Sequence, residues 1–311
     1  MNNEVVVSIY CAAYNHERYI RKTLDGFVNQ ITNFKYEVIV HDDASTDHTA
    51  DIIREYADKY PQIIKPIYQV ENQYSKGVYI FAAYVHPQMT STKYYAICEG
   101  DDYWCDANKL QMQYDYMESH PECSMCVHNT KKVNETGDDL NQVFNPLNED
   151  TNYGVDHIIR AGGGGLFHTS SFFWRKEYGV TLPDAFKIQG IGDYNRAIYF
   201  ATKGYIHYIG QVLSVYRVGS INSWVKRTNN SRQAQIKHQV NVINGLEHMN
   251  EATNHQYDES FRVAIERGRF ALLKMEKKYK EIVSDKSLRK LLWKEPIYNK
   301  FVFFVKFLIG K

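Results

Sequence analysis

The first hundred residues alternate between strand-like and helix-like patterns, and this alternation constrains the fold more than any other feature. Residues 5–12 form a β-branched run of the kind found in strands buried on both faces. The next apolar residues, Ile20, Leu24, Phe27 and Ile31, recur at helical spacing. Further strand-like runs lie at 36–40, 63–70 and 94–98, and helical patterns lie at 47–60 and from 79. This order predicts an α/β fold, with a Rossmann-like sheet covered by helices on both faces.

The rest of the chain continues this pattern and then becomes helical. We expect helices at 110–117 and 196–202, strands at 124–128, 166–174, 206–209 and 212–218, and loops across the polar stretch 134–156. From Ser231 onward the apolar residues keep helical spacing. The sequence therefore predicts one α/β domain at residues 1–225, with halves at 1–104 and 105–225. A helical C-terminal region is expected at 226–311.

Charge is balanced overall but not along the chain. The sequence holds 37 Lys+Arg and 36 Asp+Glu, and 44% of its residues are apolar, which is typical of a globular protein. Residues 226–311 contain 18 Lys+Arg against 9 Asp+Glu. Such a region fits either an anionic surface such as lipid headgroups or an ordinary solvated helical face. Aromatic residues are not interleaved with a basic patch, so we expect no nucleic-acid partner.

Cysteine usage and the length of the apolar runs predict the cellular compartment of the protein. Its 5 cysteines are scattered and odd in number, as in proteins with reduced thiols. No run reaches the ~18 to 20 apolar residues of a membrane-spanning helix, and Glu4 lies where a signal peptide needs positive charge. We therefore expect a cytoplasmic protein. The apolar residues 297–309, with flanking lysines, are expected either to lie on the inner face of the plasma membrane or to pack on the body or on a partner copy.

Polar and acidic residues follow three of the predicted strands. They are the segments 13–15 (Ala-Tyr-Asn), 41–43 (His-Asp-Asp) and 99–102 (Glu-Gly-Asp-Asp). Ligands of open α/β sheets bind beyond the carboxyl ends of the strands. We therefore expect these segments to line one crevice. A carboxylate of Asp42 or Asp43 there would accept hydrogen bonds from a base or a ribose hydroxyl, or would only shape the turn.

The segment at 99–102 places three carboxylates, Glu99, Asp101 and Asp102, at the end of a buried strand. Their mutual repulsion is costly unless a cation offsets it. A set of oxygen ligands favours Mg²⁺ or Mn²⁺ over zinc. The alternative is an acidic turn that caps the following helix.

Taken together, these motifs resemble family-2 glycosyltransferases of the GT-A fold. The matching segments, in the family's order, are Ala13-Tyr14-Asn15, Asp42-Asp43-Ala44-Ser45-Thr46-Asp47 and Glu99-Gly100-Asp101-Asp102-Tyr103-Trp104. The last one, with residues 109–113 and 71–72, resembles a bacterial subgroup with a Glu-Gly-Asp-Asp-Tyr-Trp metal motif. The resemblance covers residues 4–225, and it is specific because several motifs occur in order.

The resemblance implies a nucleotide-sugar donor, which we expect to be a UDP-sugar, bound across the strand ends. The implied donor-binding residues are Ala13, Tyr14, Asn15, Asp42, Asp43, Asp101 and Arg217. Glu99, Asp101 and Asp102 are implied ligands of Mn²⁺ or Mg²⁺. The motif begins with Glu instead of the usual Asp, which puts direct coordination by Glu99 in doubt. Arg217 is expected either near the diphosphate or in a pair with a surface acid.

The family also carries a general base in an acidic position before a helix, which matches Asp193 here. Its role is to take the proton of the attacking hydroxyl in an inverting transfer. Asp193 would equally serve as a helix cap, and both roles are compatible. The implied acceptor-binding residues are Trp104, Thr169 and Ser170.

The sequence thus predicts a metal-dependent, inverting glycosyltransferase in cell-surface polysaccharide or glycan assembly, with a saccharide or lipid-linked saccharide as acceptor. Two rival hypotheses are a sugar nucleotidyltransferase and a non-catalytic nucleotide- or sugar-binding module with a membrane- or partner-binding tail. The first would need a Gly-rich basic loop after the first strand, where this chain has Ala12-Ala13-Tyr14-Asn15. The second is disfavoured by the joint presence of Asp101, Asp102 and Asp193.

Overall fold

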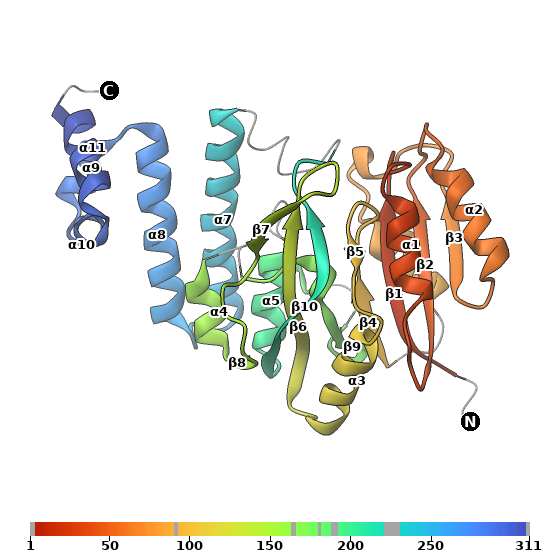
Figure 1. Cartoon of the computed structure of the whole chain (residues 1–311). Helices are drawn as coiled ribbons and strands as arrows, with labels where there is room; N and C mark the ends of the chain where they lie inside the picture. Colours follow the sequence, from red (N-terminus) through yellow and green to blue (C-terminus); the bar gives the residue numbers. More distant parts are fainter. Residues whose placement is uncertain are drawn as a thin grey trace. The chain divides into compact units, whose positions relative to one another are not determined.

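The computed structural model describes residues 4–89, 93–162, 166–179, 182–187, 192–220 and 231–308. The chain divides into two compact units (Figure 1). The first unit comprises Met1–Gly154, Gly165–Leu182 and Tyr199–Ile221, and the second comprises Val155–Gly164, Pro183–Ile198 and Asn222–Lys311. The last boundary between the units falls between Ile221 and Asn222, close to the boundary at 225 that the sequence predicts. Two earlier segments, 155–164 and 183–198, also group with the C-terminal helices, which the sequence did not indicate.

The first unit is built on a mixed sheet whose N-terminal half is parallel. Strands β1 (Val5–Ala13), β2 (Lys35–Asp42), β3 (Ile64–Tyr68) and β4 (Tyr94–Ile97) lie in the order β3-β2-β1-β4. This arrangement confirms the predicted α/β fold. Because β1 pairs with β2 on one side and with β4 on the other, the strand order reverses at β1. Ligands of open sheets bind at such a reversal.

The other half of the sheet mixes directions. Strand β9 (Phe173–Arg175) runs antiparallel to β4 and to β6 (Cys123–Val133), and β10 (Tyr205–Arg217) runs parallel to β6. The two-residue strand β5 (Tyr103–Trp104) pairs antiparallel with β10. This pairing brings the residues after β4 against the end of β10, more than a hundred positions later.

The sheet differs from the sequence expectation in three places. The strand expected at 166–174 is only the short β9, because Thr169–Ser171 form the helical turn η4. The polar stretch 134–156 contains β7 (Asp139–Val143) and β8 (Thr151–Tyr153), which pair with β6 and β10. Every residue of β7 is exposed, so this strand lacks the apolar alternation that would have revealed it. The two strands expected at 206–218 form one strand, because a register shift between Ile209 and Val212 absorbs the break. A Cβ on Gly210 there would lie 2.3 Å from the Asn148 carbonyl, so glycine is required.

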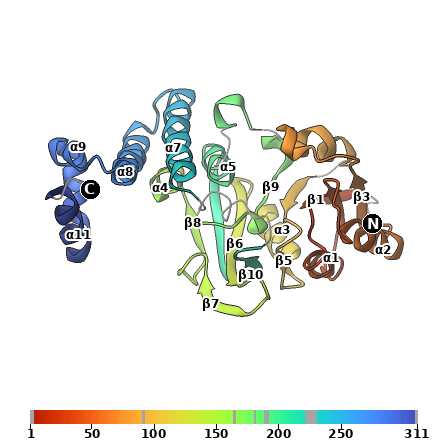
Figure 2. The same cartoon turned by 90° about the horizontal axis from the view of Figure 1, so that it is seen from above.

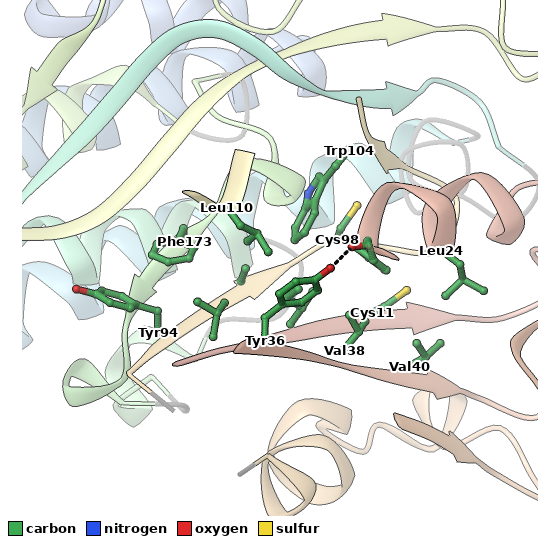
Figure 3. Packing of buried hydrophobic residues seen from close by; sticks show 14 of the residues in the cluster. Cys11, Leu24, Tyr36, Val38, Val40, Tyr94, Cys98, Trp104, Leu110 and Phe173 are labelled. Atoms are coloured by element: carbon green, nitrogen blue, oxygen red, sulfur yellow. Dashed lines mark hydrogen bonds between the residues drawn. The ribbon is translucent and has the colours of Figure 1, made fainter. Parts of the chain in front are cut away.

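Helices cover both faces of the parallel strands, as predicted. Helix α1 (Ile20–Val28) lies beside α2 (Thr49–Lys59) (Figure 2). Side chains of both helices share one core cluster with α3 (Lys109–Ser119) and the sheet, part of which Figure 3 shows. On the other face, Phe81 of the helical turn η2 (Phe81–Val85) packs on Tyr10, with 5.2 Å between the ring centroids. The remaining short helical turns are η1 (Tyr74–Lys76), η3 (His86–Gln88), η4 (Thr169–Ser171), η5 (Lys176–Tyr178) and η6 (Asp184–Phe186).

The second unit is helical, which confirms the prediction of a helical C-terminal region. Its long helices α7 (Arg232–Ala252) and α8 (Asp258–Glu276) pack together, and the shorter helices α4 (Val155–Ala161) and α9 (Tyr279–Ser284) contact α8. The remaining helices are α10 (Lys286–Lys294), α11 (Ile297–Leu308) and α5 (Gly192–Ala201), whose last residues belong to the first unit. A search of the described residues finds no helix with the length and apolarity needed to cross a membrane.

One buried cation stands out in the core of the first unit. Lys109, at the start of α3, has no exposed surface, and its Nζ lies 3.8 Å from the centroid of the Trp104 ring. No hydrogen-bond partner for this Nζ exists among the described residues. Burial lowers the pKa of Lys109 to about 7. The cation–π contact is therefore the main described interaction that offsets the cost of the buried charge.

We expect Lys109→Met to be more stable than the unmodified protein at pH 7, by roughly 2–3 kcal/mol after loss of the cation–π contact. The folded-state pKa lies below that of a free lysine, so the folded state loses stability as pH falls from about 10 to about 7. The difference in unfolding free energy should therefore shrink toward pH 10. Urea denaturation followed by circular dichroism across this pH range measures it, with the exposed Lys59→Met as control. A difference that does not change with pH would contradict the buried-charge explanation.

Candidate functional site

The acidic turn after β4 lies against the end of β1. The Gly100 N–H donates to the Ala12 carbonyl oxygen at 2.8 Å, and the Cys98 N–H donates to Tyr10 at 3.0 Å. A Cβ on Gly100 would lie 2.8 Å from His16 Nδ1 and 3.1 Å from the Ala12 oxygen. Only glycine permits this approach without movement of its neighbours. The acidic turn and the end of β1 therefore lie side by side, and a crevice lined by all three segments stays a prediction.

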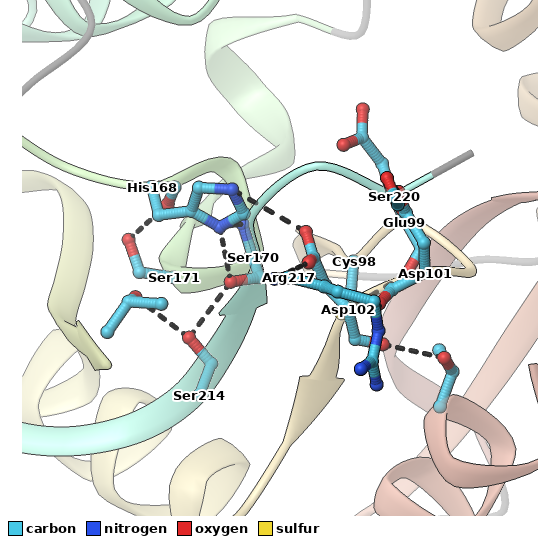
Figure 4. A network of polar contacts seen from close by, with 12 residues as sticks. Cys98, Glu99, Asp101, Asp102, His168, Ser170, Ser171, Ser214, Arg217 and Ser220 are labelled. Carbon is cyan, nitrogen blue, oxygen red and sulfur yellow. Dashed lines mark hydrogen bonds and ion pairs between the residues drawn. The ribbon is translucent and has the colours of Figure 1, made fainter. Parts of the chain in front are cut away.

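The three carboxylates of this turn converge. Oxygen atoms of Glu99, Asp101 and Asp102 all lie within 4.8 Å of one another (Figure 4). Glu99 is exposed, Asp101 is half-buried, and Asp102 is only 1% exposed. Burial, followed by the negative charges of Asp101 and Glu99, raises the pKa of Asp102 well above its usual range. The geometry thus disfavours three simultaneous negative charges at this turn unless a cation offsets them.

Residues from the end of β10 hold this turn in place. Asp102 Oδ1 accepts the Arg217 backbone N–H at 2.8 Å, and the Ser220 hydroxyl donates to Asp101 Oδ2 at 2.6 Å. The buried Arg217 guanidinium donates to the carbonyl oxygens of Asp101 and Glu135 and lies 4.5 Å from the Tyr19 ring centroid. In this structure Arg217 therefore supports the backbone of the acidic turn. Its contact with a donor diphosphate stays a prediction.

A buried chain of hydroxyl groups ends at Asp102 through His168. His168 Nε2 lies 3.5 Å from Asp102 Oδ2, and His168 Nδ1 lies 2.7 Å from Ser170 Oγ (Figure 4). Ser170 Oγ is 2.9 Å from Ser214 Oγ, which is 2.8 Å from Thr130 Oγ1. Burial lowers the pKa of His168 to about 3, so the ring is neutral at physiological pH.

The hydrogen bonds fix the tautomer of this neutral ring. His168 Nδ1 accepts the Ser170 backbone N–H at 3.3 Å, so it carries no proton. The ring hydrogen must then be on Nε2, the atom that faces Asp102. Each hydroxyl has a single hydrogen to donate. The Ser170 hydroxyl gives its hydrogen to His168 Nδ1, so it accepts from Ser214, and the Ser214 hydroxyl in turn accepts from Thr130. The chain therefore presents an N–H to the carboxylate of Asp102 without adding a net charge.

The carboxylate cluster fits a hard divalent cation. Mg²⁺ binds oxygen ligands at about 2.1 Å, so two ligands of one ion are at most about 4.2 Å apart. The oxygens of Glu99, Asp101 and Asp102 meet this limit after a shift of about half an ångström. Each oxygen of Asp101 and Asp102 has a second lone pair beyond its protein partner. These three residues would hold the ion.

The loops after β1 and β2 are joined by side-chain hydrogen bonds. Asn15 Oδ1 accepts the Thr46 N–H at 2.8 Å, and the Asn15 N–H donates to Ser45 Oγ at 2.9 Å. Asp42 accepts from Ser45, and the two oxygens of Asp43 accept the N–H groups of Gln73 and Tyr74. Asn15 and Ala44 have positive φ angles, 55° and 63°, which these bonds maintain.

The predicted donor-binding residues therefore lie together at this edge of the sheet. Ala13 ends β1 and its carbonyl oxygen accepts the Asp43 N–H at 3.0 Å, while Tyr14 follows it and is half-buried. Asp42 and Asp43 are 2% and 5% exposed. Their described contacts shape the loops, and a contact with a nucleoside stays a prediction for each of them.

Two of the predicted acceptor residues lie in the interior. Trp104 is 3% exposed and its indole N–H donates to the Ser170 carbonyl oxygen at 2.8 Å. Ser170 has no exposed surface and belongs to the hydroxyl chain. In this conformation neither side chain is accessible to an acceptor, whereas Thr169 is half-buried. The Trp104 ring instead packs edge-on against Phe27, with 4.9 Å between the ring centroids.

Asp193 lies in the first turn of α5, within the second unit. Its Oδ1 accepts the N–H of the next residue, Tyr194, at 2.8 Å, and because α5 begins at Gly192, Asp193 lies inside the first turn and not at the capping position. The side chain is half-buried. Its negative charge also acts on His238 of α7, where it opposes the lowering of the His238 pKa by burial. The role of Asp193 as a base stays a prediction.

The sequence analysis did not identify the groups that support the acidic turn. It assigned no supporting role to His168, Ser220, Thr23 or Tyr19. The Thr23 hydroxyl lies 2.6 Å from the Asp102 carbonyl oxygen, 79 residues away in the chain. No local pattern marks such residues, because each is defined by a partner distant in sequence.

Comparisons with known proteins agree with this geometry. The family model of Glycosyl transferase family 2 matches residues 8–178. The chain belongs to this family. An uncharacterized protein of Mycobacterium tuberculosis is 35% identical over 222 residues, which are 70% of this chain and 60% of that protein. The chain thus spans 60% of the length of the first curated relatives that it matches.

Two further similar proteins have names that state a nucleotide sugar. The Escherichia coli UDP-Glc:alpha-D-GlcNAc-diphosphoundecaprenol beta-1,3-glucosyltransferase WfaP is 34% identical over 114 residues, 37% of this chain and 42% of that protein. A mannosyltransferase structure from Pyrobaculum calidifontis, in complex with GDP-Man and Mn²⁺, has a TM-score of 0.53 and 18% identity. The matched region covers 100% of this chain and 89% of the mannosyltransferase chain. The GT-A-like fold is therefore shared.

We expect His168→Phe to weaken Mn²⁺ binding about 10-fold, because the variant keeps the ring packing and removes the N–H that faces Asp102. Calorimetric titration of Mn²⁺ in the presence of UDP measures the affinity. Ser171→Ala is the matched control, since the Ser171 hydroxyl donates to the His168 carbonyl oxygen and not to its ring. Equal Mn²⁺ affinity in all three proteins would show that His168 only fills space.

Proposed function

We propose that this protein is a metal-dependent, inverting glycosyltransferase that uses a nucleotide-sugar donor. The convergence of Glu99, Asp101 and Asp102 at the reversal of strand order carries the proposal. Family membership supports it, and so does the fold shared with a mannosyltransferase bound to GDP-Man and Mn²⁺. The loops at 13–15 and 42–46, joined beside the acidic turn, are the proposed donor-binding elements.

The three carboxylates would hold Mn²⁺ or Mg²⁺. When bound, the ion would offset the negative charge that develops on the leaving nucleoside diphosphate. Arg217, Ser220 and His168 keep the carboxylates together through the contacts described above. Asp193 is the proposed base that takes a proton from the attacking hydroxyl of the acceptor. Attack opposite to the leaving group inverts the anomeric centre.

We further propose a UDP-sugar as donor and a saccharide or lipid-linked saccharide as acceptor, in cell-surface polysaccharide or glycan assembly. The support is the partial similarity to WfaP, whose name states a UDP-Glc donor and a diphosphoundecaprenol-linked acceptor. The proposed location is the cytoplasm, with peripheral contact at the inner face of the plasma membrane. The basic C-terminal region is consistent with that contact.

Asp102→Ala should remove metal-dependent donor binding. We expect Mn²⁺ plus a UDP-sugar to raise the melting temperature of the unmodified protein, because a ligand that binds only the folded state stabilises it. Thermal shift across UDP-, GDP- and dTDP-sugars measures this and identifies the nucleotide. The exposed Glu99→Gln tests the same site without disturbing the interior, and the exposed Asp58→Ala is the control. An equal shift with and without Mn²⁺ would refute the metal assignment.

Asp193→Asn should keep donor binding and lose transfer by about 10²- to 10⁴-fold, the usual contribution of a general base. The amide oxygen of asparagine still accepts the Tyr194 N–H, so the helix start is preserved. Sugar transfer is measured by product formation at saturating donor. Asp184→Asn, in the same unit and with a 97% exposed side chain, is the matched control. Undiminished transfer by Asp193→Asn would assign the base to another residue.

A further inference from the structure

Helix α11 is apolar on two sides, and one of them is exposed. Phe303 is 3% exposed and packs edge-on against Tyr279 at 5.1 Å. Ile297, Phe301 and Leu308 are 82%, 68% and 81% exposed. Their spacing of four and seven residues puts them on one side of the helix. A surface helix of a globular protein normally has one apolar side, so a partner is expected to cover the second.

Aromatic residues lie near this face. Trp293 and Tyr298 are 60% and 75% exposed, and Val305 extends the apolar stripe at 39%. Trp and Tyr combine an apolar ring with a polar N–H or O–H, which suits the boundary between hydrocarbon and water. The face therefore has the composition of a helix that lies at a bilayer surface.

A basic pocket lies directly beside the start of α11. It has a volume of about 580 Å³ and is formed by residues of α8 and α10 together with Glu295 and Pro296. Its charged lining residues are Arg262, Arg267, Lys290, Lys294, Glu266 and Glu295. Phe270 and Leu291 form an apolar part of the pocket wall. The pocket thus joins cationic and apolar surface.

The carboxylates of this pocket are already paired. Glu266 lies 3.3 Å from Arg262, and Glu295 lies 3.6 Å from Lys274. Arg267, together with Lys290 and Lys294, which lie one turn apart on α10, therefore gives the pocket its excess positive charge. The surrounding segment 285–308 holds 6 basic and 2 acidic side chains. This charge is complementary to an anionic partner.

We propose that this surface docks on a bilayer that contains anionic phospholipids. In this arrangement α11 lies in the plane of the interface, with Ile297, Phe301 and Leu308 among the acyl chains. Lys290 and Lys294 hydrogen-bond the phosphate of a lipid headgroup that enters the pocket. A second copy of the chain is a poorer occupant, because a two-fold contact through α11 would bring two basic α10 helices together.

This proposal deepens the membrane contact in the proposed function, and vesicle sedimentation tests it without any assay of transfer, so its failure would leave the proposed transfer activity standing. The full chain is mixed with phosphatidylcholine vesicles, with or without phosphatidylglycerol. We expect strong binding only when phosphatidylglycerol is present. Phe301→Ser with Leu308→Ser should weaken this binding about 100-fold, and Lys290→Gln with Lys294→Gln about 30-fold.

Matched controls separate the surface from general stickiness or charge. Ile31→Ser with Val70→Ser removes two exposed apolar residues of the first unit, which are 65% and 98% exposed. Lys237→Gln with Lys280→Gln removes two exposed lysines outside the pocket lining. Both controls should bind like the unmodified protein, and circular dichroism should show an unchanged fold for all variants.

Three outcomes would overturn the proposal. The first is equal vesicle binding by the Phe301→Ser, Leu308→Ser variant and the unmodified protein. The second is a dimer in sedimentation equilibrium that the same variant dissociates, which would assign the face to a second copy. The third is complete displacement from vesicles by inorganic phosphate with no effect of the α11 substitutions, which would make the pocket a phosphate site unrelated to membranes.

Discussion

Repulsion among three carboxylates is the interaction around which the first unit is arranged. Glu99, Asp101 and Asp102 keep their oxygens within 4.8 Å, and Asp102 has almost no contact with solvent. Such a cluster needs partners that favour the charged form. They are the Arg217 N–H, the Ser220 hydroxyl and the neutral ring of His168. Only Arg217 among these residues carries a positive charge, and one cation does not balance three carboxylates, so a bound metal ion still has charge to offset.

The sheet order explains how these partners reach the turn. The parallel half places the ends of β1, β2 and β4 at one edge, and Gly100 allows β4 and β1 to approach closely there. The antiparallel pairing of β5 with β10 then brings Arg217 beside the acidic turn. The mixed half of the sheet thus supplies the support, whereas the parallel half supplies the carboxylates and the proposed donor-binding loops.

Local sequence predicted the elements that depend on local properties. The strands β1, β2 and β4 are β-branched or aromatic runs, and the acidic turn is three carboxylates in four residues, so both are visible without a structure. The exposed strand β7 has no apolar alternation and was expected to be loop. Trp104 was expected at the acceptor but packs on Phe27 and donates to Ser170, because its burial depends on elements distant in the chain.

The sequence by itself determined the α/β pattern, the helical C-terminal region and the acidic motif at a strand end, because periodicity and residue type are local quantities. Only the tertiary structure decided that His168 presents an N–H to Asp102, that Arg217 supports a turn 115 residues earlier, and that α11 exposes one apolar side while it buries the other. These features depend on which distant segments pack together. Packing is fixed by the fold of the whole unit, and no short stretch of sequence specifies it.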